Sequence, residues 1–118
     1  MQKIETDLYY PGGGVYRYLE DTYYGGGEWI LLGAWLGWYW CQTGQPAKAA
    51  RMKSFIAAQA GPDGNLPEQV SNHLLAPEQY SAWESRWGKI ANPLLWSQAM
   101  YLILSEELEL HPTPHRTE

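Results

Sequence analysis

Residues 28–42 read EWILLGAWLGWYWCQ, and this stretch decides the fold class. It is apolar on nearly every side of a helix and longer than most strands, so we expect a helix that is covered on most of its faces. Glu28 suits the positive N-terminal end of this helix. Gly33 and Gly37 lie four positions apart and predict a stripe of small residues for close helix contact. Gly44 fits the position just after the helix end.

Two further long helices are expected. Residues 46–60, PAKAARMKSFIAAQA, are rich in alanine and begin with proline, which favours the first position of a helix. The other helix begins at Pro93, with Asn92 as its cap, and continues through PLLWSQAMYLILSEEL. Residues 65–92 are mostly irregular, with a short helix within 77–87. No strand-like alternation occurs, so the predicted fold class is all-α, with about three long helices and long irregular loops.

The two ends of the chain have different patterns. Residues 1–27 are predicted to be loop, because the glycine triplets 12–14 and 25–27 bracket a polar, aromatic segment and permit close backbone approach. Neither triplet has the pattern of a phosphate-binding loop. Residues 111–118, HPTPHRTE, are predicted to be a disordered tail. Prolines separate the two histidines of this tail, so no metal site is expected there.

The composition excludes several classes of function. A chain of 118 residues is expected to form a single domain, 1–118. A net charge of −5 and eight scattered Lys and Arg residues argue against binding to nucleic acid or to an anionic membrane. The longest apolar run, 29–41, is shorter than the roughly twenty residues of a membrane span. The N-terminus lacks the apolar region of a signal peptide, and the lone Cys41 cannot form an internal disulfide. The expected location is cytoplasmic.

The aromatic residues are unusual, with seven Trp and nine Tyr beside one Phe. Rings with a polar edge suit a surface that meets hydroxyl-rich ligands, although core packing is the commoner use of any single Trp ring. The long helices are also too apolar for an isolated bundle of this size. We therefore expect the chain to belong to a larger helical assembly, formed by a longer protein or by an oligomer.

Three segments resemble motifs of glycoside hydrolase family 15, and they occur in the family's order. Residues 17–29, RYLEDTYYGGGEW, resemble the glucoamylase motif R-Y-x-E-D-x-Y-Y-x-G followed by Trp. Residues 64–70, GNLPEQV, resemble the segment that carries the catalytic base. Residues 93–99, PLLWSQA, resemble the start of the last barrel helix, with its W-S-x-A pattern.

This resemblance implies an (α/α)6 barrel of twelve helices and inverting hydrolysis that releases glucose from α-glucans or related α-glucosides. The implied substrate is an α-glucan or oligosaccharide such as starch, dextran or trehalose. The family's catalytic domain is several times longer than this chain, which resembles only its C-terminal part, an incomplete toroid. No cofactor is implied, because proton transfer at an acetal needs none.

The resemblance assigns the general base to Glu68. Inverting hydrolysis uses two carboxyl groups about 6.5–9.5 Å apart, one as acid and one as base. No segment here resembles the one that carries the family's general acid, so we expect no hydrolysis by the isolated chain. The alternative for Glu68 is a solvated loop glutamate.

The resemblance also implies a set of substrate-binding residues. The guanidinium of Arg17 would bind sugar hydroxyls, and Asp21 and Gln69 would supply carboxylate and amide partners. The aromatic walls of the pocket would be Tyr23, Trp29 and Trp96. The alternatives are a surface Arg17–Asp21 ion pair worth under about 1 kcal/mol and aromatic residues of the core. Two positions depart from the family pattern. Gly27-Glu28 stands where Asn-Pro is common, and Leu19 stands where many members have Pro.

Three functions remain open from the sequence. In the first, the chain is part of an α-glucosidase that an upstream polypeptide completes. In the second, it is a non-catalytic α-glucan-binding module. In the third, it is an inactive truncated remnant. The apolar helices need a cover in each case, either that upstream polypeptide or further copies of the chain in a homo-oligomer.

Overall fold

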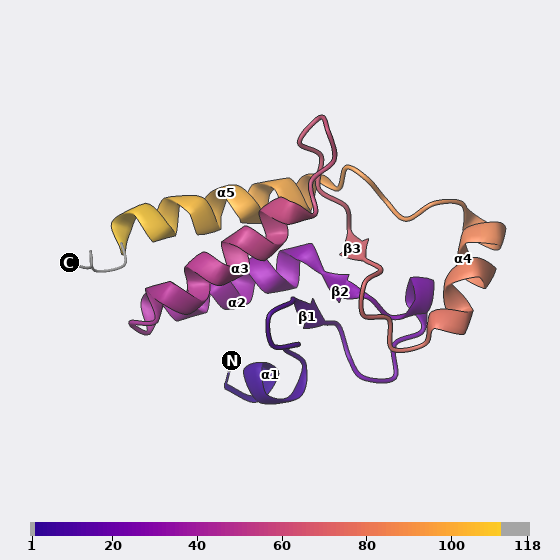
Figure 1. Cartoon of the computed structure of the whole chain (residues 1–118), viewed down its shortest axis with the longest axis horizontal. Coiled ribbons are helices and arrows are strands. Elements are labelled where there is room, and N and C mark those ends of the chain that lie inside the picture. The colour runs from indigo at the N-terminus through magenta and orange to yellow at the C-terminus, as the bar shows by residue number, and fades with distance from the viewer. Residues whose placement is uncertain (1, 112–118) are drawn as a thin grey trace.

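The computed structural model describes residues 2–111, and residues 112–118 of the predicted tail lie outside this range. Three long helices form one end of the molecule, and a small sheet with a short helix forms the other (Figure 1). The helices are α1 (Gln2–Asp7), α2 (Ile30–Gln42), α3 (Pro46–Ala58), α4 (Tyr80–Trp87) and α5 (Leu95–Leu110), with 3-10 turns η1 (Tyr23–Gly25) and η2 (Pro77–Gln79). The strands are β1 (Val15–Tyr16), β2 (Glu28–Trp29) and β3 (Gln69–Val70). The described chain is mainly helical, which confirms the predicted fold class.

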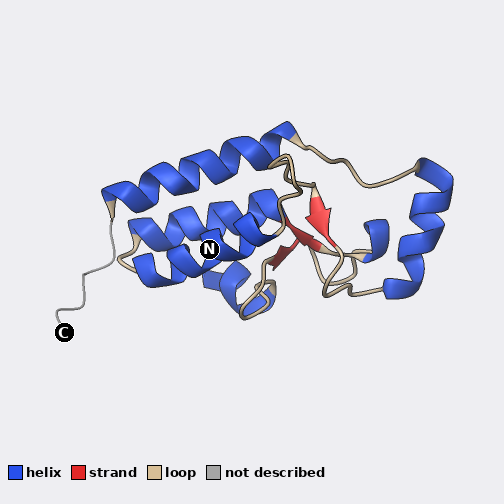
Figure 2. Ribbon diagram, turned by 45° about the horizontal axis from the view of Figure 1, so that its top comes forward, coloured by secondary structure: helices blue, strands red, loops and turns tan. Residues whose placement is uncertain are grey.

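The three long helices lie side by side, with α2 packed against both α3 and α5 (Figure 2). Their shared core includes Leu36, Trp40 and Leu104, all nearly inaccessible to solvent. The stripe of small residues on α2 serves two neighbours. A Cβ on Gly33 would lie 3.0 Å from Met52 of α3, and a Cβ on Gly37 would lie 2.9 Å from Leu104 of α5. The predicted close helix contact is thereby confirmed.

Two of the predicted helix starts are wrong. The first long helix begins at Ile30 because Glu28 and Trp29 belong to β2, so Glu28 is not at a helix terminus. The last helix has Leu94 as its N-cap, and Asn92 precedes a cis peptide bond to Pro93 instead of capping the helix.

Three other predicted features are confirmed. Gly44 directly follows Thr43, the C-cap of α2, and has a left-handed φ of 74°. Proline is the first residue of α3. The segment within 77–87 contains η2 and α4.

The sheet is antiparallel, with β2 between β1 and β3. Val15 pairs with Trp29, and Trp29 pairs in turn with Gln69. Strands of two residues have no room for an alternating pattern, so the sequence did not reveal them. Residues 1–27, predicted as loop, contain α1, β1 and η1.

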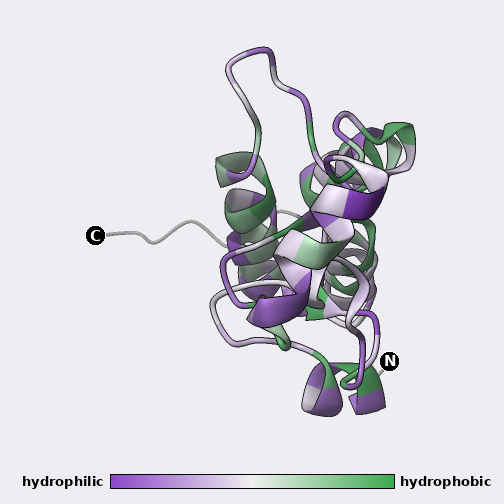
Figure 3. Ribbon diagram, turned by 90° about the vertical axis from the view of Figure 1, so that its right-hand side faces the viewer, coloured by the Kyte–Doolittle hydropathy of each residue, from purple (hydrophilic) through white to green (hydrophobic). Residues whose placement is uncertain are grey.

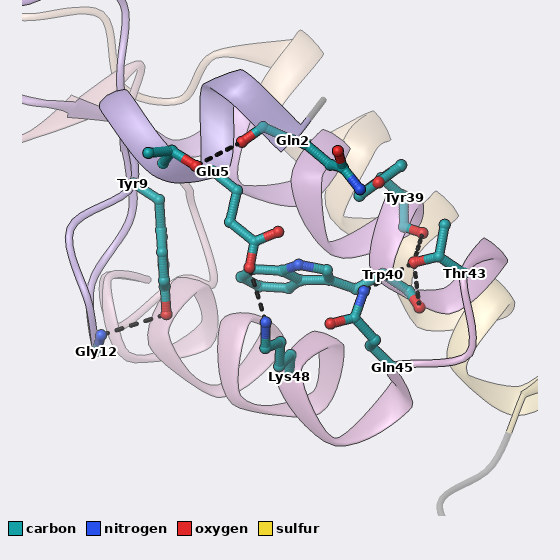
Figure 4. Close-up of polar contacts among 10 residues, drawn as sticks. Gln2, Glu5, Tyr9, Gly12, Tyr39, Trp40, Thr43, Gln45 and Lys48 are labelled. Atoms are coloured by element: carbon teal, nitrogen blue, oxygen red, sulfur yellow. Dashed lines mark hydrogen bonds and ion pairs between the residues drawn. The ribbon is translucent and has the colours of Figure 1, made fainter.

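The short helix α1 is fixed on α3 through an aromatic and charged contact (Figure 4). Lys48 Nζ lies 2.7 Å from Glu5 Oε2 and 5.5 Å from the centre of the Trp40 ring. The hydrogen bond from Lys48 lowers the pKa of Glu5. Tyr9 meets the same Trp40 ring edge-on, at 5.2 Å between centroids. These contacts connect the N-terminal segment to the helical layer.

Apolar side chains also reach the surface of the long helices. Figure 3 shows hydrophobic stretches along several helices, including helices at the outside of the fold. The most exposed examples on α2 and α5 are Trp35, Leu95, Trp96, Leu102 and Leu110. Among residues 2–111, no helix is both long and apolar enough to cross a membrane, and no three metal-ligating side chains gather. The outer helical surface is therefore apolar in places that residues 2–111 leave uncovered.

The packing of α5 against α2 can be tested by mutation. We expect Leu104→Ala to lower the free energy of unfolding by about 2–5 kcal/mol, because this 0% exposed side chain fills the space between α2 and α5. Leu102→Ala, at a 65% exposed position of the same helix, should change it by no more than about 0.5 kcal/mol. Urea unfolding followed by tryptophan fluorescence measures both values. Equal losses in the two variants would contradict the assigned packing.

Candidate functional site

The predicted site residues gather where the sheet meets the start of α2. Arg17 follows β1, Tyr23 begins η1, Trp29 ends β2, and Glu68 immediately precedes β3. Antiparallel pairing places Trp29 opposite Gln69, next to Glu68. Residues far apart in the sequence are thereby brought into one cluster.

Arg17 and Asp21 form a two-point ion pair. Arg17 Nε donates to Asp21 Oδ2 at 3.0 Å, and Nη2 donates to Oδ1 at 2.9 Å. The backbone N–H of Tyr23 donates to the same Oδ1 at 3.0 Å. Asp21 is only 1% exposed whereas the Arg17 side chain is 37% exposed, so the ion pair has one buried and one solvent-facing partner. The bond to Asp21 raises the pKa of the Arg17 guanidinium, which stays charged.

Aromatic rings surround the guanidinium. The Arg17 Cζ atom lies 5.0 Å from the ring centres of both Tyr23 and Trp29. These two rings stack at 5.9 Å, and Trp83 of α4 meets Tyr23 edge-on at 5.1 Å. Within residues 2–111, Arg17 Nη1 has no hydrogen-bond partner. The arrangement presents a charged donor beside flat apolar faces, which suits a ligand with both hydroxyls and C–H surfaces.

The loop at η1 depends on a glycine and on Gln69. Gly26 has a φ of 72°, and a Cβ there would run into the carbonyl oxygen of Asp21. Gln69 Nε2 donates to the carbonyls of Tyr23 and Tyr24, at 3.1 Å each. The Oε1 atom of Gln69 is buried and has no partner among the described residues. The Gln69 side chain therefore holds the backbone of the loop with one end and leaves an acceptor unused.

Glu68 is held by its backbone from two sides. Its N–H donates to Ala91 at 2.9 Å, and its carbonyl accepts from Ile30 at 3.2 Å. The preceding Pro67 carbonyl accepts from the buried Ser97 hydroxyl at 2.9 Å. These bonds connect the loop to the starts of α2 and α5, and they give Glu68 a defined position.

The Glu68 carboxyl is partly withdrawn from solvent. Its Oε1 atom is buried and has no hydrogen-bond partner in the described part of the chain. Burial, with the Glu68 carboxylate as the next cause, raises the pKa of Tyr23 to about 12, so the two groups interact. A buried carboxylate oxygen without a partner is costly and rare in a purely structural role. Glu68 thus differs from the solvated loop glutamate that was its alternative.

Trp96 is the second residue of α5, next to Ser97. It is 58% exposed on α5 and makes no ring contact with Tyr23 or Trp29. Its neighbour Ser97 makes the inward contact to the Glu68 loop instead. Ser97 and Trp83 were not identified from the sequence, although Ser97 stands inside the quoted W-S-x-A pattern. Its contact partner is far away in the chain, and no local pattern reveals it.

The similar proteins of named activity are glycosidases. No family model matches the chain. It is 55% identical over 100 residues to an isomaltose glucohydrolase of Kribbella flavida, covering 85% of this chain and 26% of that protein. It is 31% identical over 115 residues to an uncharacterized glycosyl hydrolase of Methanocaldococcus jannaschii, covering 86% of this chain and 17% of that protein.

Solved structures agree with these relatives. A wild-type glycosidase structure superposes with a TM-score of 0.86 at 52% identity, over 92% of this chain and 29% of that one. A glycosidase variant in complex with glucose gives a TM-score of 0.86 at 51% identity, with the same coverage. The chain spans only about a quarter of the isomaltose glucohydrolase and less of the second curated relative. It is therefore homologous to part of a glycosidase.

The ion pair supplies a second prediction. Arg17→Ala removes the side-chain partner of the buried Asp21 carboxylate and should lower the free energy of unfolding by about 2 kcal/mol, less than for a fully buried pair because Arg17 is partly exposed. Arg51→Ala, at an exposed position of α3, is the matched control and should stay within about 0.5 kcal/mol of wild type. Urea denaturation measures both. An Arg17→Ala value as small as the control would show that the pair is energetically unimportant.

The tyrosine shifts predict a dependence on alkaline pH. Burial and neighbouring carboxylates raise the pKa of Tyr16 and of Tyr23 to about 12, against about 10 in the unfolded chain. Their contribution to stability is complete below about pH 10 and is lost as the pH rises toward about 12. We expect the free energy of unfolding to fall over this range, and to fall less in Tyr23→Phe. A Tyr23→Phe slope equal to that of the wild type would be the contrary result.

Proposed function

We propose that this chain is the C-terminal catalytic part of an inverting glycoside hydrolase of family 15, with Glu68 as general base and an α-glucoside as substrate. The observation that supports this proposal best is the Glu68 carboxyl, whose backbone is anchored on both sides and whose buried Oε1 has no partner among the described residues, next to Tyr23. The relative named isomaltose glucohydrolase supports isomaltose, a glucose disaccharide, as the first substrate to test.

In the proposed reaction, Glu68 takes a proton from a water molecule that attacks the anomeric carbon. The bond from this carbon to the leaving oxygen breaks on the opposite face of the sugar. A general acid, supplied by a segment beyond this chain, protonates the leaving oxygen. One water is consumed, the configuration inverts, and no oxidation occurs. General base catalysis of this kind contributes about 10²–10⁴ in rate.

The other site residues have binding roles in this proposal. The free Nη1 of Arg17 donates to sugar hydroxyls while Asp21 holds the guanidinium in place. Tyr23 and Trp29 supply the apolar wall, and the unused Oε1 of Gln69 accepts from water or sugar. Trp96 is proposed as a more distant wall on α5 (its side chain is exposed).

The proposed partner is an upstream polypeptide that completes the barrel. Two observations support this partner. Apolar side chains of α2 and α5 are exposed, and the chain matches only part of the length of its relatives. A homo-oligomer is the alternative cover. The cytoplasmic location stays a prediction, which cell fractionation tests.

The function is tested by supplying the missing part. We expect the purified chain alone to release no glucose from isomaltose. Mixed with the isomaltose glucohydrolase of Kribbella flavida from which the matched segment has been deleted, it should restore glucose release. Glu68→Gln should lower this restored rate by about 10²–10⁴-fold, whereas Glu106→Gln, at an exposed position of α5, should leave it unchanged.

Two outcomes would contradict the proposal. Glucose release by the chain alone would show that no further acid is needed. A Glu68→Gln chain that restores full activity would remove Glu68 from the reaction. Binding of α-glucan without any turnover in the mixture would instead favour a non-catalytic binding module, and loss of both would favour an inactive remnant.

A further inference from the structure

A second buried carboxylate lies beside the site and has no role in the reaction described above. Glu28, in the central strand β2, is 0% exposed. Its Oε2 accepts from the backbone N–H of Gly14, and its Oε1 lies 2.7 Å from Nδ1 of His73. When Glu28 is ionised its oxygens only accept, and the donor in this contact is then His73 Nδ1–H. Both oxygens of this buried group are therefore satisfied by segments distant in sequence.

The chain leaves space for this carboxylate. A Cβ on Gly13 would collide with Glu28 Oε2, and a Cβ on Gly14 would lie 3.1 Å from Glu28 Cβ and 3.0 Å from Phe55. The first glycine triplet, for which the sequence predicted close backbone approach, thus serves the Glu28 side chain. The close approach of Gly13 and Gly14 thus restricts the Glu28 carboxylate to an orientation in which it faces His73.

His73 is held by two further contacts. Its ring stacks on Tyr10 at 3.9 Å between centroids and an interplanar angle of 13°. Its carbonyl accepts from the Tyr16 hydroxyl at 2.7 Å, and Tyr16 in turn meets Tyr10 edge-on at 6.5 Å. The segment that follows β3 is thereby attached to the N-terminal loop and to β1.

The Glu28–His73 contact bears on Glu68 through β2 and β3. At one end of segment 68–73, the Glu68 carbonyl accepts from Ile30, which directly follows β2. In the middle, Val70 pairs with Glu28 across the sheet. At the other end, His73 reaches back to the Glu28 side chain. The segment is therefore attached at both ends to three consecutive residues, 28–30.

This double attachment matters because Oε1 of Glu68 has no partner in the described part of the chain. The direction of the carboxyl therefore depends on its contact with Tyr23 and on the backbone that carries it. A displacement of about 1 Å at a reacting group costs as much as 10²-fold in rate.

We propose that Glu28 and His73 are positioning residues, which hold segment 68–73 on β2 and thereby direct the Glu68 carboxyl toward its substrate. This inference rests on the proposed function, in which Glu68 is the general base. Neither residue touches the reacting atoms, and their effect passes through the backbone of β3.

The test compares two His73 variants. His73→Phe keeps a ring on Tyr10 but removes the donor to Glu28, whereas His73→Asn keeps a donor close to the place of Nδ1. In NMR spectra of the purified chain at neutral pH, the Glu68 carboxyl carbon is assigned by its loss in Glu68→Gln. We expect this signal to move by more than its linewidth in His73→Phe and to return toward wild type in His73→Asn.

The kinetic arm uses the same mixture with the truncated isomaltose glucohydrolase. There we expect His73→Phe to lower kcat by about 10²-fold with KM unchanged, and His73→Asn to recover most of the rate. Leu104→Ala is the control for general destabilisation and should leave the Glu68 signal in place. Should His73→Phe fail to fold, Tyr10→Leu, which removes the ring that orients the imidazole, gives the same comparison.

Several results would overturn the proposal. These are an unmoved Glu68 signal in a folded His73→Phe chain, an equal movement in Leu104→Ala, or a His73→Asn chain that behaves like His73→Phe. A mixture that releases no glucose even with the wild-type chain would count against the proposed function. The NMR comparison would still decide the positioning role, so the two failures are distinguishable.

Discussion

The first turn of α2 begins at Ile30, and the N–H of this residue donates to the carbonyl of Glu68 at 3.2 Å. The first N–H groups of a helix have no partner within the helix and must find one elsewhere. Here a backbone carbonyl of a distant loop supplies it, since no side chain caps α2. The same hydrogen bond therefore satisfies the first N–H group of α2. It also fixes the backbone of Glu68, the residue proposed as the general base. The short sheet, the long loop and the start of α5 are arranged around this contact.

Buried polar groups concentrate around the same contact. Asp21, Glu28, Gln69 and Ser97 are the buried polar or charged residues of the described chain, and all have partners on other segments or on neighbouring turns. Burying such groups is costly unless each is hydrogen-bonded. The helical layer, in contrast, is stabilised mainly by apolar packing between α2, α3 and α5. The apolar packing of the long helices thus stabilises the fold, whereas the buried polar groups at the other end position the residues of the candidate site.

The exposed apolar residues of α2 and α5 complement this division. The chain superposes with a TM-score of 0.86 on 29% of a wild-type glycosidase structure, so its local structure is similar to that part of the larger protein. In the proposed function, side chains such as Leu95 and Leu102 are exposed because the polypeptide that would cover them is a separate segment. This accounts for helices that are more apolar than a bundle of this size requires.

The fold class, the three long helices and the glycine contacts could be predicted from the sequence, because helix period, proline and glycine are local signals. The sequence also pointed to Arg17, Asp21, Tyr23 and Trp29 as one group, since they stand within thirteen residues of one another. Only the tertiary structure placed Glu28 in a strand, joined it to His73, and replaced Asn92 by Leu94 at the start of α5. Pairing of two-residue strands and the partners of buried carboxylates depend on residues some 40 positions apart. Such contacts are decided by packing of the whole chain, and a local pattern does not contain them.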